Sequence, residues 1–220
     1  MSAPEPAPSY LLWHATPLHY VPYLLATGAL LSQARLAAEH LPVRPRPTAA
    51  ARVRRLGLAG YVHLSLSPRT PLLADKRGRG WPHVLLQFPA NLLEFPGVSL
   101  LKYNTKAWRH RDDFVPVTNP EGRAALLEEH RAGRYPSLEV LIPDRLPLSA
   151  ARALHAPGPA ELELVHSLGE PPLALPLPET CVSPDLFPLG AEADLDATAA
   201  YFRACAAAGR VLPPPDLPFD

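Results

Sequence analysis

Residues 138–142 read Leu-Glu-Val-Leu-Ile, a short apolar run that carries one carboxylate. Its composition and length predict a β-strand. Alternate side chains of a strand face opposite ways, so Glu139 shares its face with Leu141, opposite the other three residues. Such a carboxylate must be solvated in a cleft or paired with a cation, unless the strand lies at a sheet edge and the glutamate simply faces the surface. Glu139 is therefore the first candidate functional residue.

A second strand follows from the strict alternation over residues 61–67, Tyr-Val-His-Leu-Ser-Leu-Ser. Its apolar residues fall on one face and His63, Ser65 and Ser67 on the other, the pattern of a half-buried strand. Further strands are predicted over residues 10–14, 83–88, 98–102 and 161–165.

Capping residues followed by proline mark two helix starts, at Thr16–Pro17 and at Asn119–Pro120. Glycine supplies the stop signals. The predicted helices span residues 17–27, 48–56, 120–130 and 194–208. Strands interspersed with helices in this way indicate an α+β fold.

The size and composition of the chain, 220 residues with 47% hydrophobic and 19% charged, allow one packed core. We expect a flexible N-terminus over residues 1–9, a main domain over 10–168, and a Pro-rich strap, helix and tail over 169–220 that pack on it. Two cysteines form neither a disulfide framework nor a metal cluster, and the nine histidines lack paired ligand spacing. No segment has the length and apolarity of a membrane span, so the expected location is the cytoplasm.

Charge is divided unevenly along the sequence. Residues 35–111 contain fourteen Lys and Arg against three Asp and Glu, a net charge of +11, whereas residues 112–220 carry −10. A cationic segment of this size indicates a polyanionic partner such as nucleic acid, because clustered Lys and Arg attract phosphates and release counterions. The alternative is that the two halves neutralise each other in the folded chain.

Aromatic residues are interspersed among these cations, a combination typical of single-strand binding, in which bases stack on rings. Modification of a base edge also requires an unpaired or flipped base, which favours single-stranded nucleic acid. The predicted contacts are Arg44, Arg46, Arg52, Lys76, Arg77, Arg79, Trp81, Lys106 and Trp108. For the segment around Lys106 and Trp108, a polar turn after a strand is an equal alternative.

Three blocks of sequence together resemble the DarT family of DNA ADP-ribosyltransferases. They are LLWHATPLHYVPYLLATGALLS at 11–32, VRRLGLAGYVHLSLSPRTPLL at 53–73 and YPSLEVLIPDRLPL at 135–148. Their order and spacing carry the resemblance, which spans about residues 10–150. It implies an ADP-ribosyltransferase-like split β-sandwich with helices around an NAD cleft.

The resemblance also implies roles for individual residues. Glu139 and Arg55 are the expected catalytic residues, with neighbouring Arg54 as the alternative arginine. NAD is the expected co-substrate, without a metal. Its implied contacts are His14, Thr16, Arg54, Ser65 and Ser67, where the two serines place the site nearer the serine-bearing branch of the superfamily.

The implied reaction is transfer of ADP-ribose from NAD to a base in single-stranded DNA, with release of nicotinamide. Nicotinamide leaves as a neutral molecule, so one glutamate beside the positively charged ribose can suffice. The resemblance implies a monomeric toxin or defence effector with an antitoxin or ADP-ribosyl hydrolase partner and no membrane association. Alternatives are transfer to RNA or protein, and a non-catalytic nucleic-acid-binding module that releases no nicotinamide.

Overall fold

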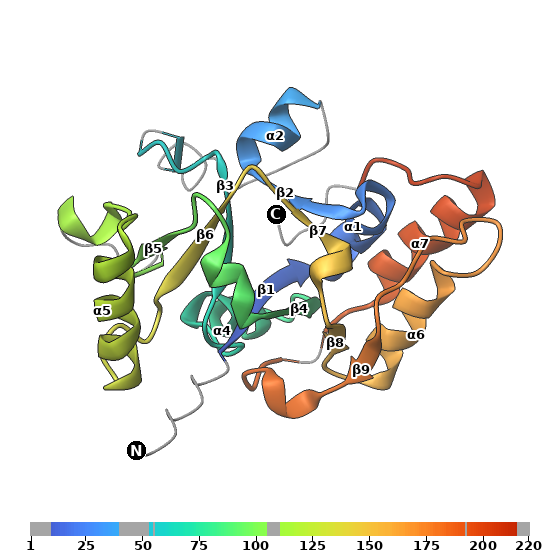
Figure 1. Ribbon diagram of the computed structural model, residues 1–220. Coiled ribbons are helices and arrows are strands. Elements are labelled where there is room, and N and C mark those ends of the chain that lie inside the picture. The colour runs from blue at the N-terminus through green and yellow to red at the C-terminus, as the bar shows by residue number, and fades with distance from the viewer. Residues whose placement is uncertain (1–9, 40–52, 55, 105–110, 192, 215–220) are drawn as a thin grey trace, which may run out of the picture.

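The computed structural model describes residues 10–39, 53–54, 56–104, 111–191 and 193–214. Its central sheet comprises β1 (Leu11–Pro17), β3 (Tyr61–Ser65), β4 (His83–Pro89), β5 (Ser99–Leu101), β6 (Glu139–Pro143), β8 (Ala153–Ala156) and β9 (Thr180–Val182). The seven strands lie in the order β5-β6-β3-β1-β4-β8-β9 (Figure 1). Neighbouring strands are antiparallel except β8 and β9, which run parallel.

The sheet consists of two halves that meet at one residue pair. β5, β6 and β3 form the first half, and β1, β4, β8 and β9 form the second. In the described part of the chain, Trp13 of β1 opposite Ser65 of β3 is the one pair that joins them. β1 pairs with β4 along all seven of its residues. One side of β1 is thus fully paired and the other nearly open, as a split sheet requires.

A second sheet pairs β2 (Ala29–Leu31) with β7 (Arg145–Pro147). The α-helices are α1 (Val21–Thr27), α2 (Gln33–Ala38), α4 (Pro71–Arg77), α5 (Pro120–Arg131), α6 (Pro159–Ser167) and α7 (Asp196–Ala208). In Figure 1, α5 lies beside β5 at one end of the central sheet, and α6 and α7 lie beside the opposite end. The helices therefore cover both ends of the sheet.

Alternate residues of the strands fill the main core. Leu12, Leu64, Phe88 and Val140 come from four adjacent strands, and each is at most 1% exposed. Phe202 of α7 packs into the same cluster. Apolar burial of this kind is the main force that holds the fold together. The opposite face of the sheet carries smaller apolar clusters and the side chains of His63, Ser65 and Glu139.

Most of the predicted elements are confirmed. The strands predicted over residues 10–14, 61–67, 83–88, 98–102 and 138–142 are β1, β3, β4, β5 and β6. Two predicted helices are α5 and α7: Asn119 caps α5 by accepting from the Gly122 amide at 2.6 Å, and Gly209 ends α7 at a φ of 61°. The helix predicted over residues 48–56 lies mostly outside the described residues.

Two predictions are wrong. Thr16 and Pro17 do not open a helix but continue β1, because both pair with β4; α1 begins at Val21 instead, with proline in its first turn. The strand predicted over residues 161–165 is helix α6, which starts at Pro159. The strand of this region is β8, and β9, inside the Pro-rich strap, occupies the sheet edge, where proline is tolerated.

Over the described ranges, no helix combines the length and the apolar character needed to cross a membrane. Cys181 and Cys205 are free thiols. Within the same ranges, no three or more His, Cys, Asp and Glu side chains gather in an arrangement that could hold a metal ion.

His83 makes the fold sensitive to acid. Its ring is fully buried, Nδ1 donates to the Trp81 carbonyl at 3.0 Å, and within the described residues Nε2 has no partner. Burial first, and then the charge of Lys76, lower the pKa of His83 to about 3. Because the folded-state pKa lies below that of the unfolded chain, the stability due to neutral His83 is present above pH 6.5. It is lost as the pH falls from there toward 3, by on the order of a few kcal/mol.

We expect His83→Asn to reduce the decrease in the free energy of unfolding that accompanies a fall in pH. Asparagine keeps an N–H at the position of Nδ1 but has no charge to gain, so the variant should start less stable at pH 7.5 and lose less on acidification. Urea unfolding at pH 7.5, 5.5 and 4.5 measures the slope. His130→Asn on α5 is the matched control for the substitution itself, because the half-buried His130 also bonds through Nδ1 to a backbone carbonyl, that of Tyr135 at 3.0 Å. Equal slopes for wild type and His83→Asn would contradict the assignment.

Candidate active site

Glu139 opens β6, and its neighbours in the sheet define its surroundings. It lies opposite Leu101 of β5 on one side and Ser65 of β3 on the other, and Ser65 in turn faces Trp13 of β1. The side chain is only 14% exposed. β6 is therefore an inner strand, which rules out a surface-facing glutamate on a sheet edge. The carboxylate lies one strand away from the junction of the two half-sheets.

A histidine from the neighbouring strand pairs with this carboxylate. His63 Nδ1 lies 2.9 Å from Glu139 Oε2, and the imidazole is 25% exposed. Burial lowers the pKa of His63, but the hydrogen bond to Glu139, the charge of that carboxylate and a backbone hydrogen bond with Leu58 outweigh it, so the pKa is raised. The half-buried Glu139 is therefore paired with an imidazole whose pKa this carboxylate helps to raise, the pairing with a basic group that the sequence allowed for.

His14 reaches the same strand from the other half-sheet. Its Nδ1 donates to the His63 carbonyl at 2.9 Å. Burial, opposed by this bond and reinforced by the charges of His63 and Lys76, lowers the pKa of His14 to about 4. The ring is therefore neutral at pH 7, and with the proton on Nδ1 its Nε2 is a hydrogen-bond acceptor.

Thr16 is two residues further along β1. Its hydroxyl is buried and has no hydrogen-bond partner in the part of the chain that the structure describes. A buried hydroxyl in this state costs about 1–3 kcal/mol unless a ligand or water completes it. His14 and Thr16 thus both leave polar atoms available for a ligand.

The two serines of the candidate site organise the chain after β3. Ser65 Oγ accepts from the Ser67 amide at 3.1 Å, and Ser67 Oγ accepts from the Arg69 amide at 3.2 Å. Ser65 lies directly opposite Glu139 in the sheet, yet the carboxylate bonds to His63 rather than to this serine. Both hydroxyls keep a proton to donate.

The two candidate arginines follow a packed residue. Arg54 is helical and exposed, and Arg55 lies outside the described residues. Val53 packs with Leu58, Leu101 and Leu141. Leu141 shares its face of β6 with Glu139, so this packing puts the backbone that carries Arg54 over the same face of the sheet.

The described part of the predicted nucleic-acid surface lies at the end of α4 and just after it. Lys76 lies at this end of α4, and its positive charge lowers the pKa of both His14 and His83. The Cζ atom of Arg79 lies 5.7 Å from the centre of the Trp81 ring, and its Nη2 lies 3.5 Å from Asp75 Oδ1. The remaining predicted contacts, Arg44, Arg46, Arg52, Lys106 and Trp108, lie outside the described residues.

Arg77 contacts the Pro-rich strap. Its Nε donates to the Pro188 carbonyl at 3.0 Å and its guanidinium lies 5.3 Å from the centre of the Phe187 ring. The side chain therefore fastens the Pro-rich strap to α4. Its predicted contact with nucleic acid stays a prediction, which only the remaining guanidinium nitrogens could make while Nε holds the Pro188 carbonyl.

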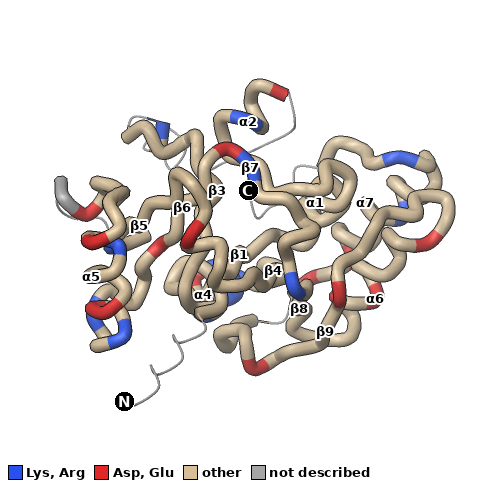
Figure 2. The backbone as a smooth tube through the Cα atoms, viewed as in Figure 1, with Lys and Arg blue, Asp and Glu red and all other residues tan. Residues whose placement is uncertain are grey.

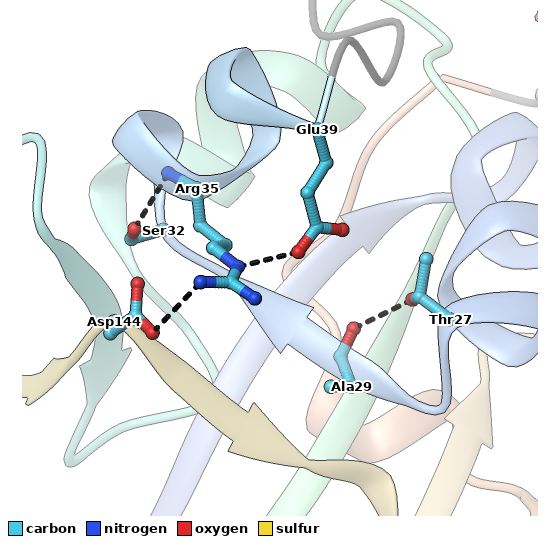
Figure 3. Close-up of polar contacts among 6 residues, drawn as sticks. All are labelled: Thr27, Ala29, Ser32, Arg35, Glu39 and Asp144. Atoms are coloured by element: carbon cyan, nitrogen blue, oxygen red, sulfur yellow. Dashed lines mark hydrogen bonds and ion pairs between the residues drawn. The ribbon is translucent and has the colours of Figure 1, made fainter.

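Some of the charge of the basic segment is neutralised within the fold. Arg35 Nε pairs with Glu39 at 2.5 Å, and its Nη1 lies 4.0 Å from Asp144 of the acidic half (Figure 3). Figure 2 shows cations and anions side by side along α5. Mutual neutralisation therefore accounts for Arg35 and, through Asp75, for part of the charge at the end of α4, where Arg79 lies 3.5 Å from that carboxylate.

Comparison with solved structures identifies the fold of this chain. No protein-family model matches this sequence, and no curated protein matches it. Among solved structures, Thermus sp. 2.9 DarT in complex with ADP-ribosylated ssDNA is similar at a TM-score of 0.61 and 15% identity, covering 81% of this chain and 96% of that one. The same protein in complex with NAD+ gives 0.61 and 17%, covering 85% and 100%. Thermosipho africanus DarTG in complex with ADP-ribose gives 0.60 and 14%, covering 81% and 51%.

These likenesses define an ADP-ribosyltransferase-like fold, and with it the α+β class predicted from the sequence is confirmed. More particularly, the chain has the DarT-like form of that fold, as the three sequence blocks indicated.

His63 is the residue of the site that the sequence analysis did not select. His63 lies on the polar face of residues 61–67 together with the two serines, and this shared face could have identified it as a further site residue. Its contact with Glu139 depends on the pairing of β3 with β6, which no local pattern specifies.

Proposed function

We propose that this chain is an NAD-dependent ADP-ribosyltransferase that modifies a base in single-stranded DNA. The observation that carries the proposal is Glu139, a half-buried carboxylate one strand from the junction of the half-sheets, held at one oxygen by His63. Within the described residues, its Oε1 has no hydrogen-bond partner. The DarT-like fold supports the proposal, since similar structures are complexes with NAD+ and with ADP-ribosylated ssDNA.

The residues around Glu139 fit NAD. Thr16 brings a buried hydroxyl that lacks a partner among the described residues, and His14 brings a neutral ring with Nε2 as acceptor. Ribose hydroxyls and the carboxamide of nicotinamide supply the complementary donors and acceptors. We assign His14, Thr16, Ser65 and Ser67 to NAD binding, and Arg54 or Arg55 to its phosphates, because guanidinium binds phosphate in a bidentate manner.

Glu139 performs the chemical role in this proposal. NAD supplies the ADP-ribosyl group and nicotinamide as the leaving group. Glu139 accepts a ribose hydroxyl through Oε1, and its negative charge stabilises the positive charge that develops on the sugar as the bond to nicotinamide breaks. That bond's electron pair leaves with nicotinamide, a ring nitrogen of the base forms the new bond, and Glu139 takes the proton that this nitrogen loses.

The end of α4 is the proposed entry surface for DNA. Lys76 and Arg79 attract the phosphate backbone, and Trp81 stacks on an unpaired base. Such a reaction suits a monomeric toxin or defence effector in the cytoplasm, with an antitoxin or ADP-ribosyl hydrolase as partner.

The direct test uses NAD labelled in its adenylate part with single-stranded oligonucleotides of each base, a duplex, RNA and bulk protein. We expect label on single-stranded DNA of one base composition, with nicotinamide released in equal amount. Label only on RNA or protein would contradict the DNA acceptor, and binding without nicotinamide release would indicate a non-catalytic module.

Trp81→Leu tests the acceptor surface. Loss of one stacking platform corresponds to about 1–3 kcal/mol, so the KM for the oligonucleotide should rise about 5- to 100-fold while the KM for NAD stays unchanged. Phe95→Leu is the matched control, because Phe95 is an aromatic residue, 53% exposed, beside β5 at another part of the fold. Equal effects of the two variants on DNA would contradict the assignment.

A further inference from the structure

We propose that His63 is the positioning residue of this site: it holds one carboxylate oxygen of Glu139 and so presents the other to the ribose. The inference rests on the proposed function, in which Glu139 is the catalytic residue.

The contact runs diagonally across two strands. Glu139 lies opposite Ser65, and His63 lies opposite Leu141, so the two partners are offset by one step of the same face. Diagonal neighbours are within reach only of long side chains. The shorter Ser65 hydroxyl, directly opposite, accepts from the Ser67 amide instead. Imidazole at position 63 is therefore the group that spans the distance to Oε2.

His63 is itself held at three points. Its carbonyl accepts from His14 Nδ1 at 2.9 Å. Its ring bonds to Glu139 through Nδ1 and to the backbone at Leu58, a residue that is 1% exposed in the apolar cluster over β5 and β6. A glutamate alone has three rotatable bonds, whereas a carboxylate tied to a fixed ring has one orientation. A misplacement of about 1 Å at a reacting group can reduce a rate about 100-fold.

Charge adds to the geometry. The groups that face His63 are Glu139 from β6, neutral His14 from β1 and the backbone of Leu58. The raised pKa of His63 follows from the carboxylate and from that backbone bond, which outweigh burial. A protonated ring donates from both nitrogens at once and favours the ionised form of its partner. His14 and Glu139 are thus linked through a single residue.

Two substitutions separate shape from hydrogen bonding. His63→Phe keeps a planar ring without a donor, and His63→Asn keeps an N–H at the position of Nδ1 without a titrating ring. We expect His63→Phe to lower kcat at least about 10-fold at pH 7.5 with the KM for NAD within about 2-fold. His63→Asn should recover kcat to within about 3-fold of wild type.

A measurement of the ring itself does not depend on turnover. The ¹⁵N chemical shifts of the His63 imidazole should titrate above the ordinary histidine range in the wild-type protein and fall back in Glu139→Gln. An unchanged titration in that variant would overturn the pairing. If the wild-type enzyme is active and His63→Phe keeps its full kcat, the positioning role alone is overturned. The same holds if the kcat of His63→Asn is as low as that of His63→Phe. A protein with the expected titration but no nicotinamide release would overturn the proposed function, and the positioning role with it.

Discussion

Replacing Glu139 with glutamine should reduce ADP-ribose transfer about 100- to 1000-fold while the protein stays folded. The amide keeps the volume and the place of the side chain opposite Ser65 but removes the negative charge that faces the ribose. Loss of one electrostatic group that acts on a transition state corresponds to about 3–4 kcal/mol. The loss should fall on kcat, because Glu139 acts where positive charge develops.

Nicotinamide release and labelled DNA, measured together, check this expectation, and circular dichroism confirms the fold. Glu163→Gln is the matched control: it makes the same chemical change at an exposed position on α6 and should leave the rate unchanged. Glu139→Ala should be equally inactive. Persistent nicotinamide release from folded Glu139→Gln protein would show that another group supplies the charge.

Replacing Trp13 with alanine should have the largest effect on stability. Trp13 is 6% exposed and packs with Leu73 of α4, Leu85 of β4 and Phe187 of the strap. Its ring also lies 5.5 Å from that of His155. Truncation of a buried tryptophan costs about 3–5 kcal/mol, a large part of the total of about 5–15 kcal/mol for a typical domain.

Urea unfolding of Trp13→Ala measures this loss directly. Leu72→Ala is the control, because Leu72 neighbours the buried Leu73 on α4 but is 37% exposed, and it should cost less than about 1 kcal/mol. We also expect the variant to lose activity, since Trp13 forms the pair with Ser65 that joins the half-sheets. A wild-type unfolding midpoint for Trp13→Ala would contradict this description of the core.

Local patterns predicted the elements whose signals are local. The alternation over residues 61–67 and 138–142 fixed which side of each strand is apolar, and so placed Glu139 opposite the main core. The error over 161–165 has a physical reason: Glu-Leu-Glu-Leu-Val alternates like a strand, but Pro159 and the contacts of α6 with β8 and β9 favour a helix. The prediction that Thr16 caps a helix was wrong because Thr16 and Pro17 pair with β4, and this pairing outweighs the local preference of a Thr-Pro sequence for a helix start.

The residues of the candidate site also differ in how far the local sequence could predict them. Glu139 was found because a carboxylate in an apolar strand is conspicuous in the sequence. His63 was missed because its role depends on a partner 76 residues away, reached only through the pairing of two strands. The bond of Arg77 to the Pro188 carbonyl could not be predicted, because a count of charges does not tell which guanidinium also bonds within the fold.

The strand order has a kinetic consequence. Among neighbours in the central sheet, only β1 with β3, β5 with β6 and β8 with β9 are consecutive strands of that sheet along the chain, and long segments separate even these. No tight hairpin in this sheet can therefore form first and serve as a template for the rest, and each pairing must close a long loop. The polypeptide should consequently reach its native state slowly, with β1 and β3 left as unprotected edges until distant segments arrive, so that synthesis at reduced temperature should favour recovery over aggregation.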